Sequence, residues 1–145
     1  MESTQSNTKN PKLKLDFKDS KYATGRRKRS IAKVWVKKGS GNIHVNGLKM
    51  NEYFKRPVHQ IIVTRPLEIS EVASNYDVRC SVKGGGLSGQ AGAIILGISK
   101  ALIAHDENLK KSLKKDKLTT RDSRVVERKK YGHRKARRSF QFSKR

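Results

Sequence analysis

The chain has 145 residues, enough for one domain, and carries 35 lysines and arginines against 12 acidic residues, a formal net charge of +23. Self-repulsion of this size opposes compaction, so we expect a polyanion in the native context, and nucleic acid is the obvious one. The sequence holds no run of eighteen apolar residues to span a bilayer and no amphipathic helix that combines lysine or arginine with tryptophan to lie on a membrane surface, so no membrane partner is expected.

Residues 1–20 are polar and aperiodic, and we expect them to form a disordered leader ahead of a globular body at 21–120. The leader lacks the apolar core of a signal sequence. It also lacks arginine and contains Glu2, Asp16 and Asp19, which is unlike a cleaved mitochondrial presequence.

A cluster of four consecutive cations opens the body. It comprises Arg26, Arg27, Lys28 and Arg29, directly after Gly25. The simpler interpretation is a solvated loop. We favour a phosphate-contacting cluster that leads into a strand, because arginine pairs bidentately with phosphate.

Residues 31–37 are rich in β-branched and aromatic side chains, which favours a strand with Ala32, Val34 and Val36 on one face. Trp35 lies on the other face. It could stack on a base, but we favour a sheet residue that covers a helix. A glycine-rich turn at 38–42 and an alternating segment at 43–45 predict an antiparallel hairpin, followed by a second turn at 46–47.

Three helical segments are predicted farther along the chain. A short turn is expected around Tyr53 and Phe54, and a helix is expected to run from Pro57 to Pro66, where proline ends it. Residues 108–118 have the pattern of a basic helix with inward leucines.

The two histidines His44 and His59 have no cysteine, aspartate or second histidine at ligand spacing. We therefore predict no metal site and interpret both as surface or edge residues. Cys80 falls in the apolar set of an alternating strand at 76–83, without a partner to activate it, so we interpret it as a core residue.

A glycine-rich segment follows that strand and leads into a predicted helix. The residues singled out in this glycine-rich segment are Gly84, Gly85, Gly86, Gly89 and Gln90. The spacing G-x-G-x-x-G would suit a dinucleotide, but no second strand ending in an acidic residue follows, and Gln90 stands where a phosphate-loop NTPase needs lysine. No cofactor is predicted. The glycines form either a tight turn alone or a turn that also offers backbone N–H groups to a phosphate.

The segment 121–145 holds eleven lysines and arginines and two acidic residues, a net charge of +9. It cannot bury enough apolar surface to offset the entropy of ordering it, so it should be extended or disordered until a polyanion neutralises it. Tyr131, Phe140 and Phe142 are interleaved among the cations, as stacking on unpaired bases requires. The alternative is a solvated tail that serves solubility. We favour an arm that enters folded RNA.

The order of these motifs resembles small-subunit ribosomal protein S9 in its bacterial and organellar form. The resemblance is carried by YATGRRK from Tyr22, GNIHVNG from Gly41, GGGLSGQAG from Gly84, and RDSRVVERKKYG from Arg121 through to the terminal Ser-Lys-Arg. It covers about residues 21–145. The glycine motif together with the terminal tripeptide is highly specific.

This resemblance implies an α/β fold of the α+β two-layer type. A small mixed sheet packs on helices with a left-handed βαβ crossover (ribosomal protein S5 domain 2-like), and a long extended C-terminal tail follows. It implies a structural protein without catalytic residues, on the head of the small subunit. Its partners would be small-subunit ribosomal RNA, neighbouring ribosomal proteins and peptidyl-site tRNA.

The resemblance also assigns expected roles to individual residues. The residues expected to bind ribosomal RNA are Arg26, Arg27, Lys28, Arg29, Arg121, Arg124, Arg128, Lys129, Lys130, Arg134, Lys135, Arg137 and Arg138. The residues expected to approach the tRNA are Ser143, Lys144 and Arg145. The expected location is a bacterial ribosome in the cytoplasm, with a ribosome of the mitochondrial matrix or plastid as the alternative.

Two further function classes stay open from the sequence. One is a small nucleotide-dependent enzyme that uses the glycine loop, although no paired carboxylates or Ser/His/Asp set stands out to support catalysis. The other is a DNA-compacting or general polyanion-binding protein, which composition alone does not separate from an RNA-binding one.

Overall fold

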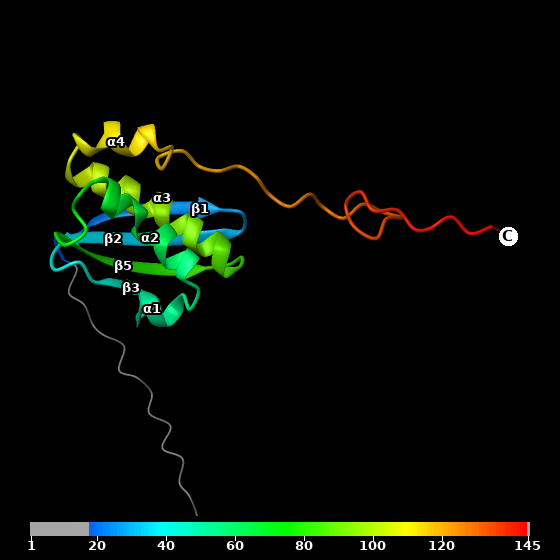
Figure 1. The fold of residues 1–145 in the computed structure, drawn as a ribbon, viewed down its shortest axis with the longest axis horizontal. Helices are drawn as coiled ribbons and strands as arrows, with labels where there is room; N and C mark the ends of the chain where they lie inside the picture. Colours follow the sequence, from blue (N-terminus) through cyan, green and yellow to red (C-terminus); the bar gives the residue numbers. More distant parts are fainter. Residues whose placement is uncertain (1–17, 145) are drawn as a thin grey trace, which may run out of the picture.

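The computed structural model describes residues 18–144. A five-stranded sheet with the order β1-β2-β5-β3-β4 forms one layer, and helices cover one of its faces (Figure 1). The elements are β1 (Lys21–Arg27), β2 (Ser30–Lys38), β3 (Ile43–Val45), β4 (Leu48–Lys49), α1 (Met50–Tyr53), α2 (Pro57–Ile69), β5 (Tyr76–Lys83), α3 (Leu87–His105) and α4 (Leu109–Lys115).

The sheet is mixed, because β3 runs parallel to β5 while the other neighbouring strands are antiparallel. The chain leaves β3 and returns to β5 through β4, α1 and α2. With the helices toward the viewer in Figure 1, this crossover has the left-handed sense, the rare hand for such a connection. The predicted fold class is therefore confirmed.

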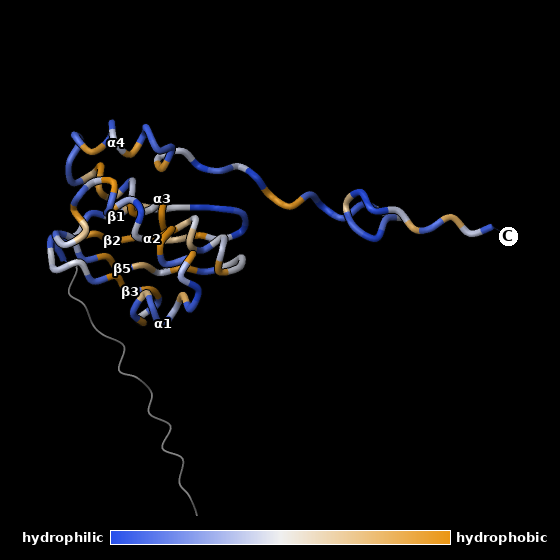
Figure 2. Tube along the Cα trace, viewed as in Figure 1, coloured by the Kyte–Doolittle hydropathy of each residue, from blue (hydrophilic) through white to orange (hydrophobic). Residues whose placement is uncertain are grey.

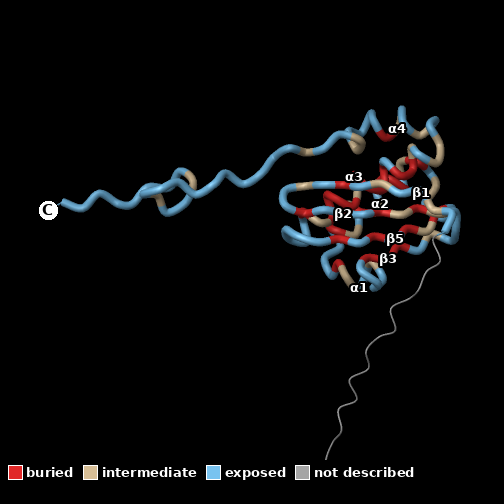
Figure 3. The backbone as a smooth tube through the Cα atoms, turned by 180° about the vertical axis from the view of Figure 1, so that it is seen from behind, coloured by how far each residue is buried: buried red, intermediate tan, exposed pale blue. Residues whose placement is uncertain are grey.

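The core lies between the sheet and α3. Alternate residues of β2 and β5 are buried: Ala32, Val34 and Val36, which the sequence placed on one face, point into the core, and so do the apolar residues of the strand at 76–83. The apolar stripe of α3 packs onto them, while α4 adds Leu113, which is fully buried. Figure 3 shows the buried residues gathered in the body, whereas the C-terminal tail is exposed along most of its length.

Small residues bring β1 unusually close to α3. A Cβ atom on Gly25 would overlap the Ala93 carbonyl oxygen and lie 2.6 Å from the Gly97 nitrogen, both on the backbone of α3. A Cβ on Gly97 would in turn collide with the Val34 side chain. The small residues of α3 therefore permit a close approach, and the approaching element is a strand.

Two strand predictions are wrong. The cluster at 26–29, predicted as a loop or a lead-in to a strand, instead spans the end of the edge strand β1 and a two-residue turn between Arg27 and Ser30. The expected hairpin between 31–37 and 43–45 does not form, because β5 lies between β2 and β3. The turn at Asn46-Gly47 is confirmed, and both residues have positive φ.

Two further predictions, for the end of α2 and for the two histidines, are also wrong. Pro66 does not end this helix, which continues to Ile69, and its ring is buried in the core. His44 and His59 are buried rather than exposed, and the His59 ring packs edge-on against Phe54 with centroids 5.8 Å apart. An aromatic neighbour thus replaces the expected solvent around His59.

Cys80 lies in the core, as predicted, and burial raises the pKa of its thiol above the ordinary value. The thiol is therefore protonated at neutral pH, which suits a small packing residue rather than a nucleophile. The apolar helix α3 has the length and hydropathy of a membrane span, but most of it is buried in the body, as expected of a core helix.

The carboxylate of Asp77 organises the turn at 39–42. Its Oδ1 accepts hydrogen bonds from the backbone N–H groups of Ser40, at 3.0 Å, and Asn42, at 2.8 Å. Partial burial raises the pKa of Asp77, but these hydrogen bonds outweigh it and hold the pKa below its ordinary value.

We expect Asp77→Asn to lower the free energy of unfolding at neutral pH by less than about 1 kcal/mol, because the carboxylate is largely exposed. The folded-state pKa is lower than the unfolded one. The stabilisation is therefore complete above the unfolded value of about 4 and is lost as pH falls through the folded value. Urea unfolding of both proteins from about pH 7 to pH 3 checks this, and a difference that grows toward acid pH would contradict it.

Candidate nucleic-acid interface

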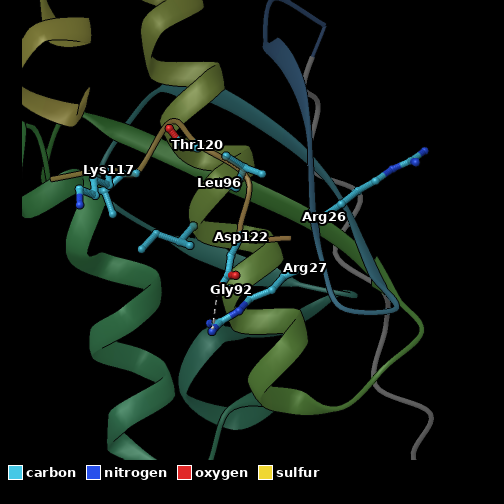
Figure 4. Close-up of a pocket in the computed structure, with 9 residues that line it drawn as sticks. Arg26, Arg27, Gly92, Leu96, Lys117, Thr120 and Asp122 are labelled. Atoms are coloured by element: carbon cyan, nitrogen blue, oxygen red, sulfur yellow. Dashed lines mark ion pairs between the residues drawn. The ribbon is translucent and has the colours of Figure 1, made fainter. Parts of the chain in front are cut away.

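The four-cation cluster lies at one end of the sheet, around the turn between β1 and β2. Strand alternation places Arg26 and Arg27 on opposite faces: Arg27 lies against α3, where a Cβ on Gly92 would overlap its side chain. Figure 4 shows Arg27 pointing toward Asp122 and Arg26 pointing away. Lys28 and Arg29 form the exposed turn, and Lys28 has a φ of 51°.

The start of the tail is fixed to this cluster by Asp122. Its Oδ2 lies 3.3 Å from Nη2 of Arg27 and 2.8 Å from Nη2 of Arg124. The hydrogen bonds from Arg124, with smaller attraction from both guanidinium groups, hold the pKa of Asp122 well below its ordinary value. The carboxylate therefore stays ionised at any physiological pH, and it draws residues 122–124 of the tail onto the body.

The Arg27–Asp122 contact borders an open pocket of about 150 Å³ between β1, α3 and the segment that follows α4 (Figure 4). Its lining residues include Gly92 and Leu96 of α3, Leu118 and Thr120 after α4, and Arg27. Because Gly92 has no side chain, the arginine stem can lie flat on the helix. The tail thus begins at a defined position relative to the sheet.

The glycine-rich turn lies beside the cluster and needs glycine at two positions. Gly84 and Gly85 have φ values of 78° and 60°, a region that favours glycine. The Ser30 hydroxyl donates a 3.0 Å hydrogen bond to the Gly84 carbonyl oxygen, and a Cβ on Gly85 would overlap that hydroxyl. Gln90 also donates to the Gly84 oxygen, at 3.2 Å.

These contacts support the tight-turn interpretation for Gly84 and Gly85. Gly86 differs: a Cβ there would meet nothing within 4 Å, and the residue is the N-cap of α3 without a side-chain capping bond. Helix N-termini attract anions through their N–H groups. The open space at Gly86 is therefore compatible with a phosphate, while Gln90 accepts a hydrogen bond from Tyr53 and donates one to Gly84.

A groove of about 420 Å³ joins the cluster, the glycine turn and the proximal tail. It is lined by Lys28, Arg29, Gly85, Gly86 and residues 125–129. Three groups that the sequence singled out separately thus lie together at one end of the sheet. Four of the nine lining residues are cations and one is acidic, so the groove is an anion-attracting surface.

Beyond the groove, residues 130–144 of the tail extend away from the body (Figure 1). Glu127 pairs with Lys130 at 3.6 Å and with Arg137 at 2.9 Å, closing a loop. Within this loop the Arg134 N–H donates to the Arg138 carbonyl oxygen at 2.8 Å, and the Arg134 guanidinium lies 5.3 Å from the Phe140 ring centroid. The tail is predominantly hydrophilic, as Figure 2 shows.

The tip of the tail lies far from the groove (Figure 1), and the structure describes it as far as Lys144. Arg145 and leader residues 1–17 lie outside the described residues. The remaining cations of the predicted RNA-binding set are exposed in the tail; they are Arg121, Arg128, Lys129, Lys130 and Lys135. The predicted site therefore divides into a groove on the body and an exposed arm.

Sequence reasoning missed the part played by the two acidic residues of the tail. Asp122 and Glu127 entered the charge count only as offsets, yet one fixes the start of the tail and the other closes its loop. Their scarcity among eleven cations was the available signal, because an isolated carboxylate in such a field is held by arginines. Within residues 18–144, no three His, Cys, Asp or Glu side chains are grouped as a metal site requires.

The protein has a sheet covered by helices on one face, a cationic groove and an exposed basic arm. These features together define a class of protein that associates with a folded polyanion. Residues 25–145 match the family described as Ribosomal protein S9/S16. The chain belongs to this family, and it is a ribosomal protein of the small subunit, a structural constituent that serves translation in association with ribosomal RNA and other ribosomal proteins.

Proposed function

We propose that the chain binds small-subunit ribosomal RNA on the subunit head, with a body at 21–120 and an RNA-embedded tail at 121–145. One observation carries the proposal: the cluster at 26–29, the glycine turn and residues 125–129 of the tail line a single groove. A groove with this charge attracts a sugar–phosphate backbone, and the arm extends the same charge away from the body.

In this proposal the exposed arginines and lysines neutralise phosphates and so position the protein without reading base sequence. Arg27 has a second task, because its guanidinium also holds Asp122 at 3.3 Å. Arginine suits both tasks, since its planar group offers five donors. Phosphates would compete with Glu127 for Lys130 and Arg137, so the tail loop between Glu127 and Arg137 would open when RNA binds.

Co-sedimentation with small ribosomal subunits after a high-salt wash tests this function. The wash removes proteins held only by loose electrostatic attraction, because such binding falls steeply with salt. We expect the chain to stay with the subunits. Quantitative release, together with equal affinity for duplex DNA and folded ribosomal RNA at the same salt, would instead indicate a general polyanion-binding protein.

We further propose that Ser143, Lys144 and Arg145 contact tRNA in the peptidyl site. The support is the resemblance of the terminal tripeptide and the distance of the described tip from the body (Figure 1). Removal of residues 143–145 is expected to leave folding and subunit assembly intact. It should weaken peptidyl-site tRNA binding about tenfold, the effect of losing one charge-assisted hydrogen bond of about 1.5 kcal/mol.

Filter binding of tRNA to reconstituted subunits measures this effect. The matched control is Lys144→Arg, which preserves the charge at the tip and should bind nearly as tightly as the unaltered chain. Equal tRNA affinity of the truncated and complete chains would remove the tRNA role while leaving the ribosomal RNA role standing. We place the ribosome in a bacterial cytoplasm, with an organelle ribosome as the alternative.

A further inference from the structure

The face of the sheet opposite the helices has no cover among the described residues. Helix α3 contacts β1, β2 and β5 on the buried side, and α2 packs on α3. On the other side, the side chains of Lys33, Arg79, Ser81 and Lys83 are exposed and Trp35 is half-buried. The preferred prediction for Trp35, that it covers a helix, is therefore wrong.

Strand register arranges this open face in rows across three strands. One row consists of Tyr22, Trp35 and Arg79, which are direct partners on β1, β2 and β5. The rings of Tyr22 and Trp35 have centroids 5.3 Å apart at 42°, and the Arg79 guanidinium lies 5.8 Å from the Trp35 ring centroid. Two aromatic rings and a cation thus form one continuous surface, with Tyr22 49% exposed.

The rows beside it are polar and basic. Thr24, Lys33 and Ser81 form the next row, about 7 Å away along the strands. Arg26, Ile31 and Lys83 form the third row, which reaches the cluster at the β1–β2 turn. The open face therefore reaches the four-cation cluster through Arg26.

The charge on this face specifies the class of ligand. Its cations are Arg26, Lys33, Lys37, Arg79 and Lys83. Lys37 is paired across β2 and β5 with Asp77, an acidic residue whose Oδ1 accepts hydrogen bonds from the 39–42 turn. Flat aromatic rings among cations attract nucleic-acid bases, and they reach the faces of bases only when those bases are unpaired.

We propose that the open sheet face, centred on Trp35 and Tyr22, is a second RNA-binding site that stacks unpaired nucleotides of ribosomal RNA. Lys33, Lys83 and Arg26 hold the flanking phosphates, and the hydroxyls of Thr24 and Ser81 face the sugar edge, where a 2′-hydroxyl bonds them. The inference rests on the proposed function, since both require RNA as the ligand. It adds a site that the groove and the tail do not contain.

Trp35 is the single tryptophan of the chain, so its fluorescence reports on this face alone. The full chain is titrated, at fixed salt, with an unstructured single-stranded RNA of about eight nucleotides and with duplex RNA of the same length. We expect the single strand to quench Trp35 and to shield it from acrylamide, and the duplex to bind without doing either.

Variants measure the energy of stacking. Trp35→Leu keeps an apolar side chain without a π-face and should weaken single-strand binding about fivefold or more, the effect of losing one stacked base. Trp35→Phe retains a ring and should stay close to the unaltered chain. Ile61→Leu, an exposed site on α2 in the helix layer, is the matched control and should bind normally.

The outcomes separate this site from the proposed function. If RNA binds with normal affinity but leaves the emission and acrylamide access of Trp35 unchanged, the stacking site is wrong and the groove-and-tail function stands. If no RNA binds at all, the proposed function fails as well. If Trp35 becomes shielded only when other small-subunit proteins are added, the face docks a protein, and the RNA proposal is overturned.

Discussion

A chain that ends at Thr120 is expected to lose most of the salt dependence of its binding to small-subunit RNA. The segment 121–145 holds eleven of the 35 cations and a net charge of +9. Each neutralised phosphate contributes about 0.7 to 0.9 to the slope of log affinity against log salt, so removing the tail should lower that slope by up to about 6 to 8.

The effect on affinity should be correspondingly large. A protein with about six to ten phosphate contacts loses a factor of about 10³ to 10⁵ between roughly 50 and 200 mM salt. We expect the complete chain to behave in this way and the truncated chain to change far less. Filter binding or fluorescence anisotropy over that salt range gives both slopes from one experiment.

Replacing Arg128, Arg134, Arg137 and Arg138 with lysine is the matched control. Lysine keeps the charge and hence the slope, while the loss of bidentate pairing and stacking weakens binding at every salt concentration. Parallel slopes for the complete and truncated chains would show that the tail carries no phosphate contacts, and the assignment of its cations to RNA would then be wrong.

The second large effect concerns stability. Gly25→Ala is expected to lower the free energy of unfolding by about 3 kcal/mol or more, at or above the upper end for overpacking. The added Cβ would overlap the Ala93 carbonyl oxygen and lie 2.6 Å from the Gly97 nitrogen. Both atoms belong to the backbone of α3, so relief requires β1 or the helix to move.

Thermal unfolding followed by circular dichroism measures the change, and a loss of this size should lower Tm by more than about 10 °C. Gly86→Ala makes the same chemical change where a Cβ would meet nothing within 4 Å. It should cost about 1 kcal/mol or less, mainly through the less favourable N-cap. Similar Tm values for both variants would contradict the close β1–α3 contact.

Hydrophobic periodicity in the sequence predicted the strand and the helix whose buried residues recur at a regular spacing. In β5, every second residue from Tyr76 to Val82 is buried, and α3 has an apolar stripe at helical spacing. Strand β1 escaped prediction because its buried face contains Gly25 and Ala23, which leave no hydrophobic signal. The side chains on that face of β1 are small because the backbone of α3 lies directly against it.

Nonlocal pairing explains the remaining errors. The segments 31–37 and 43–45 look like a hairpin in the sequence, but a strand that begins at Tyr76 inserts between them. Alternation likewise separates Trp35 from Val34 and Val36 without saying which face carries the helices. The smaller face is the buried one, since Gly97 brings α3 directly against Val34.

The candidate site was predictable in its cations but not in its arrangement. Runs of arginine and lysine marked both the cluster at 26–29 and the tail, because charge density is visible without a fold. Their meeting in one groove depends on Asp122 and on the glycine turn beside Ser30. Those contacts join residues about a hundred and about fifty positions apart, distances over which a sequence pattern gives no information.

Hydrogen exchange of the tail amides tests most directly whether RNA orders this arm. The backbone amides of residues 125–144 are compared in the free chain and in assembled small subunits. The segment has no helix or strand and almost no burial of its own, so we expect fast exchange in the free chain and strong protection in the subunit. Tail amides as strongly protected in the free chain as in the subunit, or as weakly protected in the subunit as in the free chain, would contradict the claim that RNA orders the tail.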